Sequence, residues 1–294
     1  MKKILATVAL FFALASTSAF ANEYKCDKKF IFFPGGPEGG PFGTIVYNGA
    51  VAAAEHTGCK VDYYWSQWNS EIMIKQFKEA VALQPDGIAI YGFPGDAAMR
   101  PIINEAIEMG IVITTMNTPL PDLEAEFKTS GFGYAGADLF DAGFNLGKKG
   151  VEVCGLKAGD KAFIWGLASM PNRGERTKGA IAGVESMGVK VVYQEIPDNV
   201  NSDASQGTPM YVATYAANPD IKMAITDHGG LTASLPTYMK AAGHGTEAVC
   251  GAGFDLSAPI VDGINSGYID VVIDQQPFIQ GYMPIVQLYL STKF

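Results

Sequence analysis

Two aspartates, Asp227 and Asp255, stand just after two short segments, 223–226 and 248–253, that have the composition of buried strands. In an open parallel sheet, ligands bind outside the carboxyl ends of the strands, so both carboxylates are candidates for a binding cleft. Ionised carboxylates accept hydrogen bonds from ligand hydroxyls. A pair of them about 5–10 Å apart can instead act as the acid and the base of glycoside hydrolysis. A binding protein and an α/β hydrolase are therefore alternative functions.

The predicted loops at the carboxyl ends of the strands suit a neutral polyhydroxy ligand. They are rich in Trp, Phe, Asp, Asn, Gln and Gly, and most of the lysines lie elsewhere in the chain. Aromatic rings cover the C–H face of such a ligand, whereas carboxylates and amides hold its hydroxyl groups. These loops comprise residues 34–43, 65–69, 91–96, 116–121, 166–173, 195–203, 226–231, 254–258 and 273–277.

Three other chemistries lack their sequence patterns. The loop 34–43 contains neither G-x-x-x-x-G-K-[ST] nor G-x-G-x-x-G, and its three prolines remove backbone donors that a phosphate would use. There is no G-x-S-x-G elbow, and a lone histidine in a predicted cleft loop, His228, does not favour nucleophilic catalysis. The four cysteines and three histidines lack metal-ligand spacing. We expect no catalytic residue, no metal and no cofactor.

The cysteines are expected to be structural. Cys26 and Cys59 lie just before the predicted strands 30–33 and 61–65. If these strands are parallel neighbours, the two sulfur atoms lie at the same edge of the sheet and can form a disulfide. The alternative is two free buried thiols. Pairing of Cys154 with Cys250 is left open.

The elements that must position these residues alternate between strand and helix. Breakers such as Gln84-Pro85-Asp86-Gly87 and Asn218-Pro219-Asp220 stand just before predicted strands. The alternating order predicts a parallel sheet covered by helices on both faces, and it starts again near residue 139. Two consecutive units of similar size predict an α/β fold with two Rossmann-like, doubly wound lobes. The predicted strands are 30–33, 61–65, 87–91, 111–116, 132–135, 162–165, 190–195, 223–226, 248–253 and 269–273.

Residues 1–21 have the pattern of a secretory signal peptide. Lys2 and Lys3 precede an apolar run, 4–14, and Ala19-Phe20-Ala21 is an A-x-A cleavage site. The apolar run is shorter than the roughly 20 residues that span a bilayer. We expect cleavage after Ala21, a periplasmic location and, because no cysteine follows the site, no lipid anchor.

Composition excludes several partner classes. Removal of residues 1–21 would leave 273 of the 294 residues and would shift the net charge from −9 to −11, because two lysines are lost. An acidic surface without a basic run opposes binding to nucleic acid and to anionic membranes. We expect a monomer that binds a small molecule.

Five short motifs follow one another along the chain. Pro41-Phe42, with Asn48-Gly49-Ala50 and Ala53-Ala54-Glu55 closing on Gly58, comes first; Gln84-Pro85-Asp86-Gly87-Ile88, Arg176-Thr177-Lys178-Gly179, Gly253-Phe254-Asp255 and Asp274-Gln275-Gln276-Pro277 follow. In this order they resemble the type I periplasmic sugar-binding proteins, the ribose- and galactose-binding group of ABC importers. The resemblance covers nearly the whole mature chain. It implies an N-terminal lobe of 22–136 plus 276–294, a C-terminal lobe of 137–275 and a hinge between them.

The resemblance also implies roles for individual residues. Phe42 would stack on a sugar face, and Asp227, Asp255 and Gln275 fall on polar binding positions. Arg173 lies close to a cleft arginine of the family, although Gly174 is an alternative match for that position. Asp255 could instead cap the following helix, and Arg173 could be a solvated surface charge.

The chain departs from the family in three places. Met116 and Asn117 replace the Asp-Arg pair of ribose-like members, which puts pentose specificity in doubt and makes Asn117 a candidate ligand residue. Gly43 replaces a second aromatic residue, so Trp68 and Phe93 are candidates for the missing ring, unless Trp68 packs against a neighbouring helix. The family ends with a third crossover strand, so we expect a C-terminal segment that this sequence lacks.

These observations predict the periplasmic solute-binding component of an ABC importer, selecting a small neutral sugar or polyol. The expected partners are that ligand and an inner-membrane permease, and a chemoreceptor is compatible with the same role. DNA-regulator relatives share the fold, but this chain has an export signal and no N-terminal helix-turn-helix. The alternative is an exported, glycosidase-like α/β hydrolase that uses the cleft carboxylates.

Overall fold

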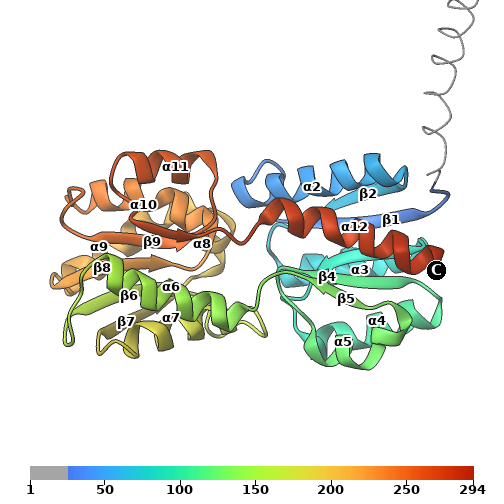
Figure 1. The fold of residues 1–294 in the computed structure, drawn as a ribbon, viewed down its shortest axis with the longest axis horizontal. Helices are drawn as coiled ribbons and strands as arrows, with labels where there is room; N and C mark the ends of the chain where they lie inside the picture. Colours follow the sequence, from blue (N-terminus) through green and yellow to red (C-terminus); the bar gives the residue numbers. More distant parts are fainter. Residues whose placement is uncertain (1–25) are drawn as a thin grey trace, which may run out of the picture.

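The computed structural model describes residues 26–294, which form two lobes side by side (Figure 1). The predicted signal peptide, 1–21, and its cleavage site lie outside the described residues. Each lobe contains one parallel five-stranded sheet with helices on both faces. The structure confirms the predicted fold class.

The first sheet has the strand order β2-β1-β3-β4-β5. Its carboxyl edge faces the second lobe (Figure 1). Within residues 26–136, the strands are β1 (Lys29–Gly35), β2 (Lys60–Trp65), β3 (Gly87–Tyr91), β4 (Val112–Met116) and β5 (Gly133–Ala135); the helices are α2 (Pro41–Thr57), α3 (Ser70–Ala82), α4 (Asp96–Glu108), α5 (Pro121–Phe127) and the 3-10 turn η1 (Lys128–Ser130).

The second sheet has the order β10-β9-β8-β6-β7. The last helix of the chain, α12 (Pro277–Lys293), returns to the first lobe (Figure 1). The strands are β6 (Lys161–Gly166), β7 (Lys190–Glu195), β8 (Ile221–Thr226), β9 (Cys250–Phe254) and β10 (Val271–Ile273); the helices are α6 (Leu139–Val153), α7 (Glu175–Glu185), α8 (Asp198–Ser202), the 3-10 turn η2 (Ala204–Gly207), α9 (Thr208–Ala217), α10 (Gly229–Ala241) and α11 (Ala258–Asn265).

The strand composition explains why both sheets are buried on their two faces. Phe30, Ile31, Phe32 and Phe33 are consecutive in β1 and all are fully buried. A continuous apolar run, rather than an alternating one, is typical of a parallel strand covered by helices on both sides. The central strand of the first lobe is therefore held by core packing above and below the sheet.

Helix α12 fastens the end of the chain to the first lobe. An added Cβ on Gly49 of α2 would overlap the carbonyl oxygen of Phe278, and one on Gly281 would overlap that of Val46. Glycine at both places therefore lets the two helix backbones lie in direct contact. Ile285 of α12 is fully buried in the core of the first lobe.

The chain crosses between the lobes at two places, 136–138 and 274–276. The first crossing joins β5 to α6, and the second joins β10 to α12. We keep the predicted lobe limits, 22–136 with 276–294 and 137–275, as a proposal that agrees with these crossings.

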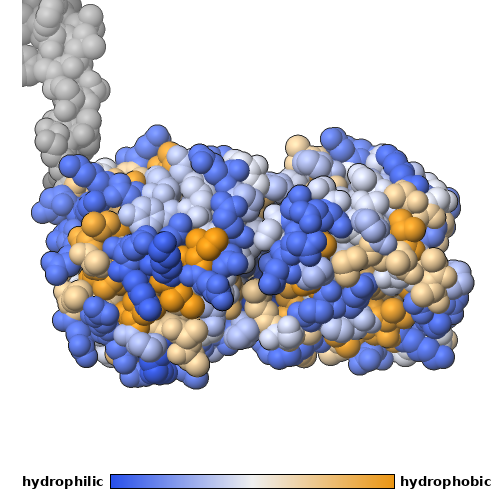
Figure 2. Space-filling model, turned by 180° about the vertical axis from the view of Figure 1, so that it is seen from behind, coloured by the Kyte–Doolittle hydropathy of each residue, from blue (hydrophilic) through white to orange (hydrophobic). Residues whose placement is uncertain are grey.

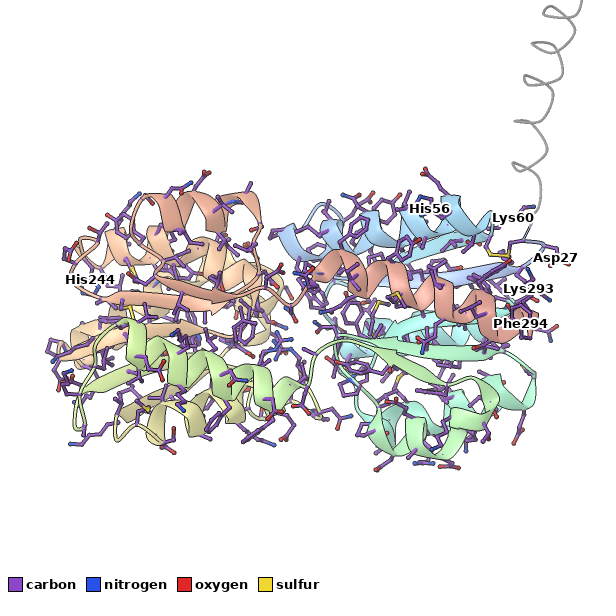
Figure 3. The ribbon with its side chains drawn as sticks, viewed as in Figure 1. Asp27, His56, Lys60, His244, Lys293 and Phe294 are labelled. Carbon is purple, nitrogen blue, oxygen red and sulfur yellow. A yellow bond between two sulfur atoms is a disulfide. The ribbon has the colours of Figure 1, made fainter. Side chains whose placement is uncertain are left out.

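Two disulfides are present, each beside a sheet (Figure 3). Cys26 pairs with Cys59, and the two residues lie just before the parallel neighbours β1 and β2. Cys154 pairs with Cys250, which joins the end of α6 to the start of β9. Residues 26–294 contain no free cysteine.

The face seen in Figure 2 is mostly hydrophilic, with small apolar patches on both lobes. None of the helices within residues 26–294 is both long enough and apolar enough to cross a membrane.

Candidate functional site

A cavity of about 340 Å³ lies between the carboxyl edges of the two sheets. The first lobe contributes the loops after β1 to β4, and the second lobe contributes the loops after β6 to β10. This is the location that the topology of open parallel sheets favours for ligands. The residues that line it on the two sides include Phe42, Trp68, Tyr91, Phe93, Asn117, Arg173, Arg176, His228, Asp255 and Gln275.

Four aromatic rings form the wall of the cavity in the first lobe. The ring centroid of Trp68 lies 6.0 Å from that of Phe42, 5.4 Å from that of Tyr91 and 6.4 Å from that of Phe93. Tyr91 is fully buried and its hydroxyl donates a hydrogen bond to the Pro34 carbonyl oxygen at 3.2 Å. Tyr91 and Phe93 therefore support the more accessible rings of Trp68 and Phe42.

The two residues that lie against the Trp68 ring, Gly35 and Gly36, have to be glycine. An added Cβ on Gly35 or on Gly36 would overlap the indole ring, and Gly35 also has φ +96°. Residues that carry a side chain rarely adopt this backbone conformation, whereas glycine does so readily. The glycine-rich loop after β1 therefore seats an aromatic ring, and the absence of a phosphate motif from its sequence agrees with this role.

Three candidate ligand residues have left-handed backbone conformations. The φ angles are +55° at Trp68, +59° at Asn117 and +78° at Asp255. Asn and Asp tolerate this region, whereas Trp is rarely found there. Such conformations cluster where the surrounding structure holds a functional side chain in place. Each of these residues follows the end of a strand and turns its side chain into the space between the lobes.

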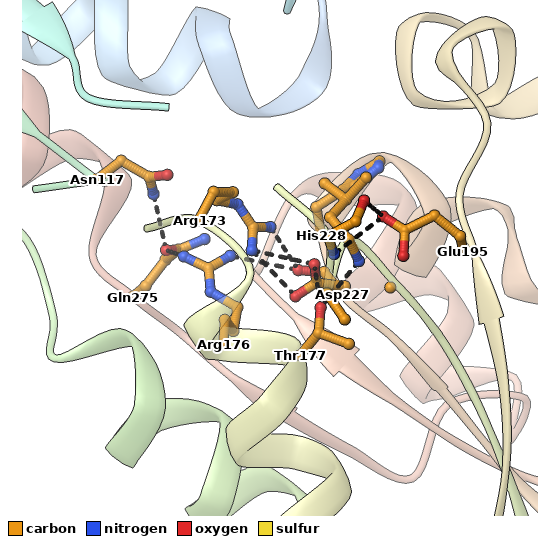
Figure 4. A network of polar contacts seen from close by, with 12 residues as sticks. Asn117, Arg173, Arg176, Thr177, Glu195, Asp227, His228 and Gln275 are labelled. Atoms are coloured by element: carbon orange, nitrogen blue, oxygen red, sulfur yellow. Dashed lines mark hydrogen bonds and ion pairs between the residues drawn. The ribbon is translucent and has the colours of Figure 1, made fainter. Parts of the chain in front are cut away.

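Amide side chains connect the loop after β4 to the second crossing of the chain (Figure 4). Asn117 Nδ2 donates to Gln275 Oε1 at 3.0 Å and to Gln280 Oε1 at 3.0 Å. Gln280 Nε2 donates to the Gln275 carbonyl oxygen at 2.7 Å. All three side chains are buried, so these bonds are protected from water and tie the loop after β4 to the start of α12.

Asp227 holds Arg173 rather than lining the cavity. Arg173 Nη1 lies 3.0 Å from Asp227 Oδ2, and Thr177 Oγ1 donates to the same oxygen at 3.0 Å. Asp227 is 3% exposed and is absent from the cavity wall, whereas Arg173 lines it. Asp227 thus fixes a residue of the cavity wall, and the direct ligand contact expected of Asp227 stays a prediction. The solvated-charge alternative for Arg173 does not fit its 6% exposure.

Arg176 is a second buried arginine of the cavity wall, and sequence reasoning did not select it as a site residue. Its Nη2 donates to Gln275 Oε1 at 2.6 Å, its Nη1 donates to the Asp227 carbonyl oxygen at 3.3 Å, and its guanidinium lies 4.6 Å from the centroid of the Phe254 ring. Burial, and then the nearby charge of Arg173, lowers the pKa of Arg176 to about 10. The motif at 176–179 includes Arg176, but this motif was used only as evidence for the family resemblance.

Asp255 offers an acceptor to the cavity. Its Oδ1 accepts a hydrogen bond from Gln275 Nε2 at 2.8 Å, while its Oδ2 lies beside the backbone of Gly229 and makes no hydrogen bond of normal geometry within residues 26–294. Burial raises the pKa of Asp255 to about 6, although Gln275 and Arg176 act in the opposite direction. Asp255 does not cap α11, because the residue preceding that helix is Ser257.

His228 also lines the cavity, at the start of α10. Its Nε2 is buried and has no hydrogen-bond partner in the described part of the chain. Burial, with the charges of Arg173 and Arg176, lowers the pKa of His228 to about 3, so the imidazole is neutral. A neutral imidazole can both donate and accept a hydrogen bond. The sequence analysis did not select His228 as a site residue because it is a lone histidine; its position in the loop after β8 was the available signal.

Most of the predicted ligand residues come together in this cavity, but the prediction of their roles is not tested by the fold. Phe42, Trp68, Phe93, Asn117, Arg173, Asp255 and Gln275 line it, and Asp227 lies behind Arg173. Among residues 26–294, no group of three or more His, Cys, Asp or Glu side chains is arranged to hold a metal.

Residues 31–292 match the family model described as the periplasmic binding protein domain. The chain belongs to this family. The match spans both lobes and the segments that join them, and therefore includes the whole cavity.

Individual relatives are distant in sequence. The xylose/arabinose-binding protein of Sulfolobus acidocaldarius is 22% identical over 244 residues, which are 78% of this chain and 58% of that protein. A glucose-galactose binding protein from Geobacillus stearothermophilus has a similar structure, with TM-score 0.76, 23% identity and 90% of each chain covered. A solute-binding protein from Burkholderia graminis in complex with D-arabinose has TM-score 0.78 and 20% identity over 92% of this chain and 91% of that one. These structural likenesses establish the shared fold.

Proposed function

We propose that this periplasmic binding protein is the solute-binding component of an ABC importer and binds a small neutral sugar or polyol between its lobes. Cleavage after Ala21 would release it into the periplasm, where the closed, ligand-bound form is presented to an inner-membrane permease. The sugar-binding relatives and the residues of the cavity support this proposal.

The observation that carries the proposal is the difference between the two walls of the cavity. The first lobe presents Phe42 and Trp68, and the second lobe presents Arg173, His228 and Asp255. A sugar ring has a C–H face that packs on aromatic rings and a rim of hydroxyl groups that need hydrogen-bond partners. The unpartnered Asp255 Oδ2 and His228 Nε2 would accept such hydroxyls.

The charges of the cavity favour a neutral ligand. Arg173 is neutralised by Asp227 at 3.0 Å, and Arg176 lies close to Asp255 as well as to Gln275. The buried charges are thus already paired or nearly balanced inside the protein. An anionic or cationic ligand would add an uncompensated charge to a buried site, which is costly.

The hydrolase alternative has weaker support. An acid and a base would both have to face the substrate, but the Asp227 carboxylate is occupied by Arg173 and Thr177 behind the cavity wall. Asp255 alone does not supply the pair of carboxylates that glycosidases generally use. The arrangement of these residues therefore favours binding over catalysis.

Titration calorimetry against pentoses, hexoses, myo-inositol, sugar alcohols and amino acids tests the proposed ligand class. We expect one or a few neutral sugars or polyols to bind with micromolar affinity, about 8 kcal/mol. Asp255→Asn should weaken that binding roughly 5- to 150-fold, because a ligand hydroxyl loses its charged acceptor. An amino acid or an anion as the tight ligand would refute the proposed class.

A further inference from the structure

The segment 170–173, which follows β6, touches both lobes. Met170 packs against the hydrophobic core of the first lobe and against that of the second lobe. Arg173, three residues later, lines the cavity and pairs with Asp227. One short stretch of the second lobe therefore carries both a candidate ligand contact and a contact with the opposite lobe.

Pro171 fits against the loop that precedes α4 in the first lobe. A Cβ added to Gly95 would come within 2.7 Å of the Pro171 Cβ, and Gly95 has φ +88°. The absence of a side chain at Gly95 therefore allows the two lobes to approach closely at this point.

Asn172 of the second lobe forms hydrogen bonds with the first lobe. Its Nδ2 donates to Asp96 Oδ2 at 2.8 Å and to the Pro119 carbonyl oxygen at 3.1 Å. Asp96 is itself fixed, because its Oδ1 accepts the backbone N–H groups of Asp122 at 3.1 Å and Leu123 at 3.0 Å, at the start of α5. The amide of the second lobe thus meets an acceptor that is already held in place by the first lobe.

The backbone of Asn172 is arranged for this contact. Its φ is +53°, a left-handed conformation that asparagine tolerates better than most residues. Asn172 is not among the residues that line the cavity. Its two hydrogen bonds therefore act on the relative position of the lobes and not on the ligand directly.

We propose that Asn172 is a positioning residue that latches the two lobes together in the closed form by binding Asp96 and the Pro119 carbonyl. The inference rests on the proposed function, in which closure around the ligand is the functional step. Because Arg173 is the next residue, movement of the latch also moves a side chain of the cavity wall. The latch stabilises the closed form equally for every ligand that permits closure.

The kinetics of ligand release distinguish a latch from a ligand contact. Asn172→Ala removes both hydrogen bonds, and Asn172→Asp also places a second carboxylate beside Asp96. We expect the dissociation rate constant to rise roughly 10- to 100-fold in both variants, more in Asn172→Asp, with little change in the association rate constant. The affinity loss should be the same factor for every sugar or polyol that the wild type binds, because Asn172 does not touch the ligand.

Single-molecule fluorescence energy transfer measures closure itself. Dyes placed on Lys78→Cys in α3 and Glu185→Cys in α7, both exposed, report the distance between the lobes, and no free cysteine within residues 26–294 competes for label. We expect Asn172→Asp to lower the ratio of closed to open molecules roughly 10-fold or more, without ligand or with a saturating sugar from the panel. Asn265→Ala, at an exposed site on α11, is the matched control and should leave the ratio unchanged.

The outcomes separate the latch from the proposed function. A wild-type protein that binds none of the sugars or polyols refutes the proposed ligand class, whatever the closure data show. Equal ratios of closed to open molecules in the wild type and in Asn172→Asp, or a wild type without closed molecules under any condition, would overturn the latch. Urea unfolding of both variants shows whether the fold is intact, and a loss that differs among sugars would make Asn172 a ligand contact instead.

Discussion

Arg173 of the cavity wall and Asp227 behind it form a buried ion pair, with Nη1 and Oδ2 separated by 3.0 Å and with side chains that are 7% and 2% exposed. Thr177 donates to the same carboxylate at 3.0 Å. A buried charge depends on its partner, because each ion has given up its hydration. The position of Arg173 in the cavity wall is therefore set by a residue that does not itself line the cavity.

Asp227→Ala should lower both stability and affinity. Removal of the carboxylate leaves Arg173 buried without its ion-pair partner, which costs about 3–5 kcal/mol of unfolding free energy. Asp227→Asn keeps the shape and one acceptor, and we expect a smaller loss. Urea unfolding and calorimetry on both variants measure the effects. Lost binding at full stability would instead indicate that Asp227 contacts the ligand, as the sequence suggested.

Asp255 should make stability depend on pH. Burial raises the pKa of Asp255 to about 6, above the value of 3.8 for an ordinary carboxyl, so the folded protein retains this proton where the unfolded chain has lost it. Stability should therefore fall as the pH rises from about 4 to about 6, by about 3 kcal/mol for this group. Relative to the wild type, Asp255→Asn should gain stability between pH 4 and pH 7.5 in urea unfolding. A difference that is independent of pH would contradict the raised pKa.

His228 should act in the opposite direction. Its pKa is lowered to about 3 by burial and by Arg173 and Arg176, whereas the imidazole of the unfolded chain binds a proton below about 6.5. The folded state therefore loses stability relative to the unfolded chain as the pH falls from about 6.5 toward 3. His228→Gln, measured by urea unfolding at pH 7 and pH 4.5, should lose less stability on acidification than the wild type. An equal loss would place His228 in a more hydrated environment.

Gly35→Ala should weaken ligand binding through Trp68. The added methyl group would overlap the indole ring and the Tyr91 ring, so Trp68 has to move out of the cavity wall. Gly39→Ala is the matched control, because Gly39 also has a left-handed backbone, φ +82°, but has open space around it. Affinity by calorimetry should fall roughly 5-fold or more for Gly35→Ala beyond any loss in the control. Equal losses would assign the effect to backbone strain alone.

The Cys26–Cys59 disulfide should resist alkylation. The two residues are 33 positions apart, and closing a loop of this length stabilises the folded state by about 3–4 kcal/mol in the chain-entropy model. Peptide mapping of periplasmic protein, alkylated without reductant, should recover the two cysteines as one linked pair. Labelling of both thiols in folded protein would show that they are free.

The fold was predictable because its signals are local. The apolar run 30–33 and breakers such as Gln84-Pro85-Asp86-Gly87 mark strand ends within a few residues, and parallel strands bring the loops that follow them to one edge. The direction in which the side chains of those loops point is not determined by the neighbouring sequence. Asp227 and His228 are neighbours, yet one points behind the wall and the other into the cavity. That choice depends on Arg173, more than 50 residues away.

The contact between α2 and α12 has a consequence for biosynthesis. Gly49 and Gly281 bring the first and last long helices of the described chain together, and Ile285 and Leu288 complete the core around β1. Residues 139–273, by contrast, contain all strands and all helices of the second lobe in one continuous stretch. The second lobe can therefore fold as soon as it emerges, whereas the first lobe must wait for residues 277–293. If the chain is exported as proposed, this delay would keep residues 26–136 from completing their core before the last helix has been synthesised.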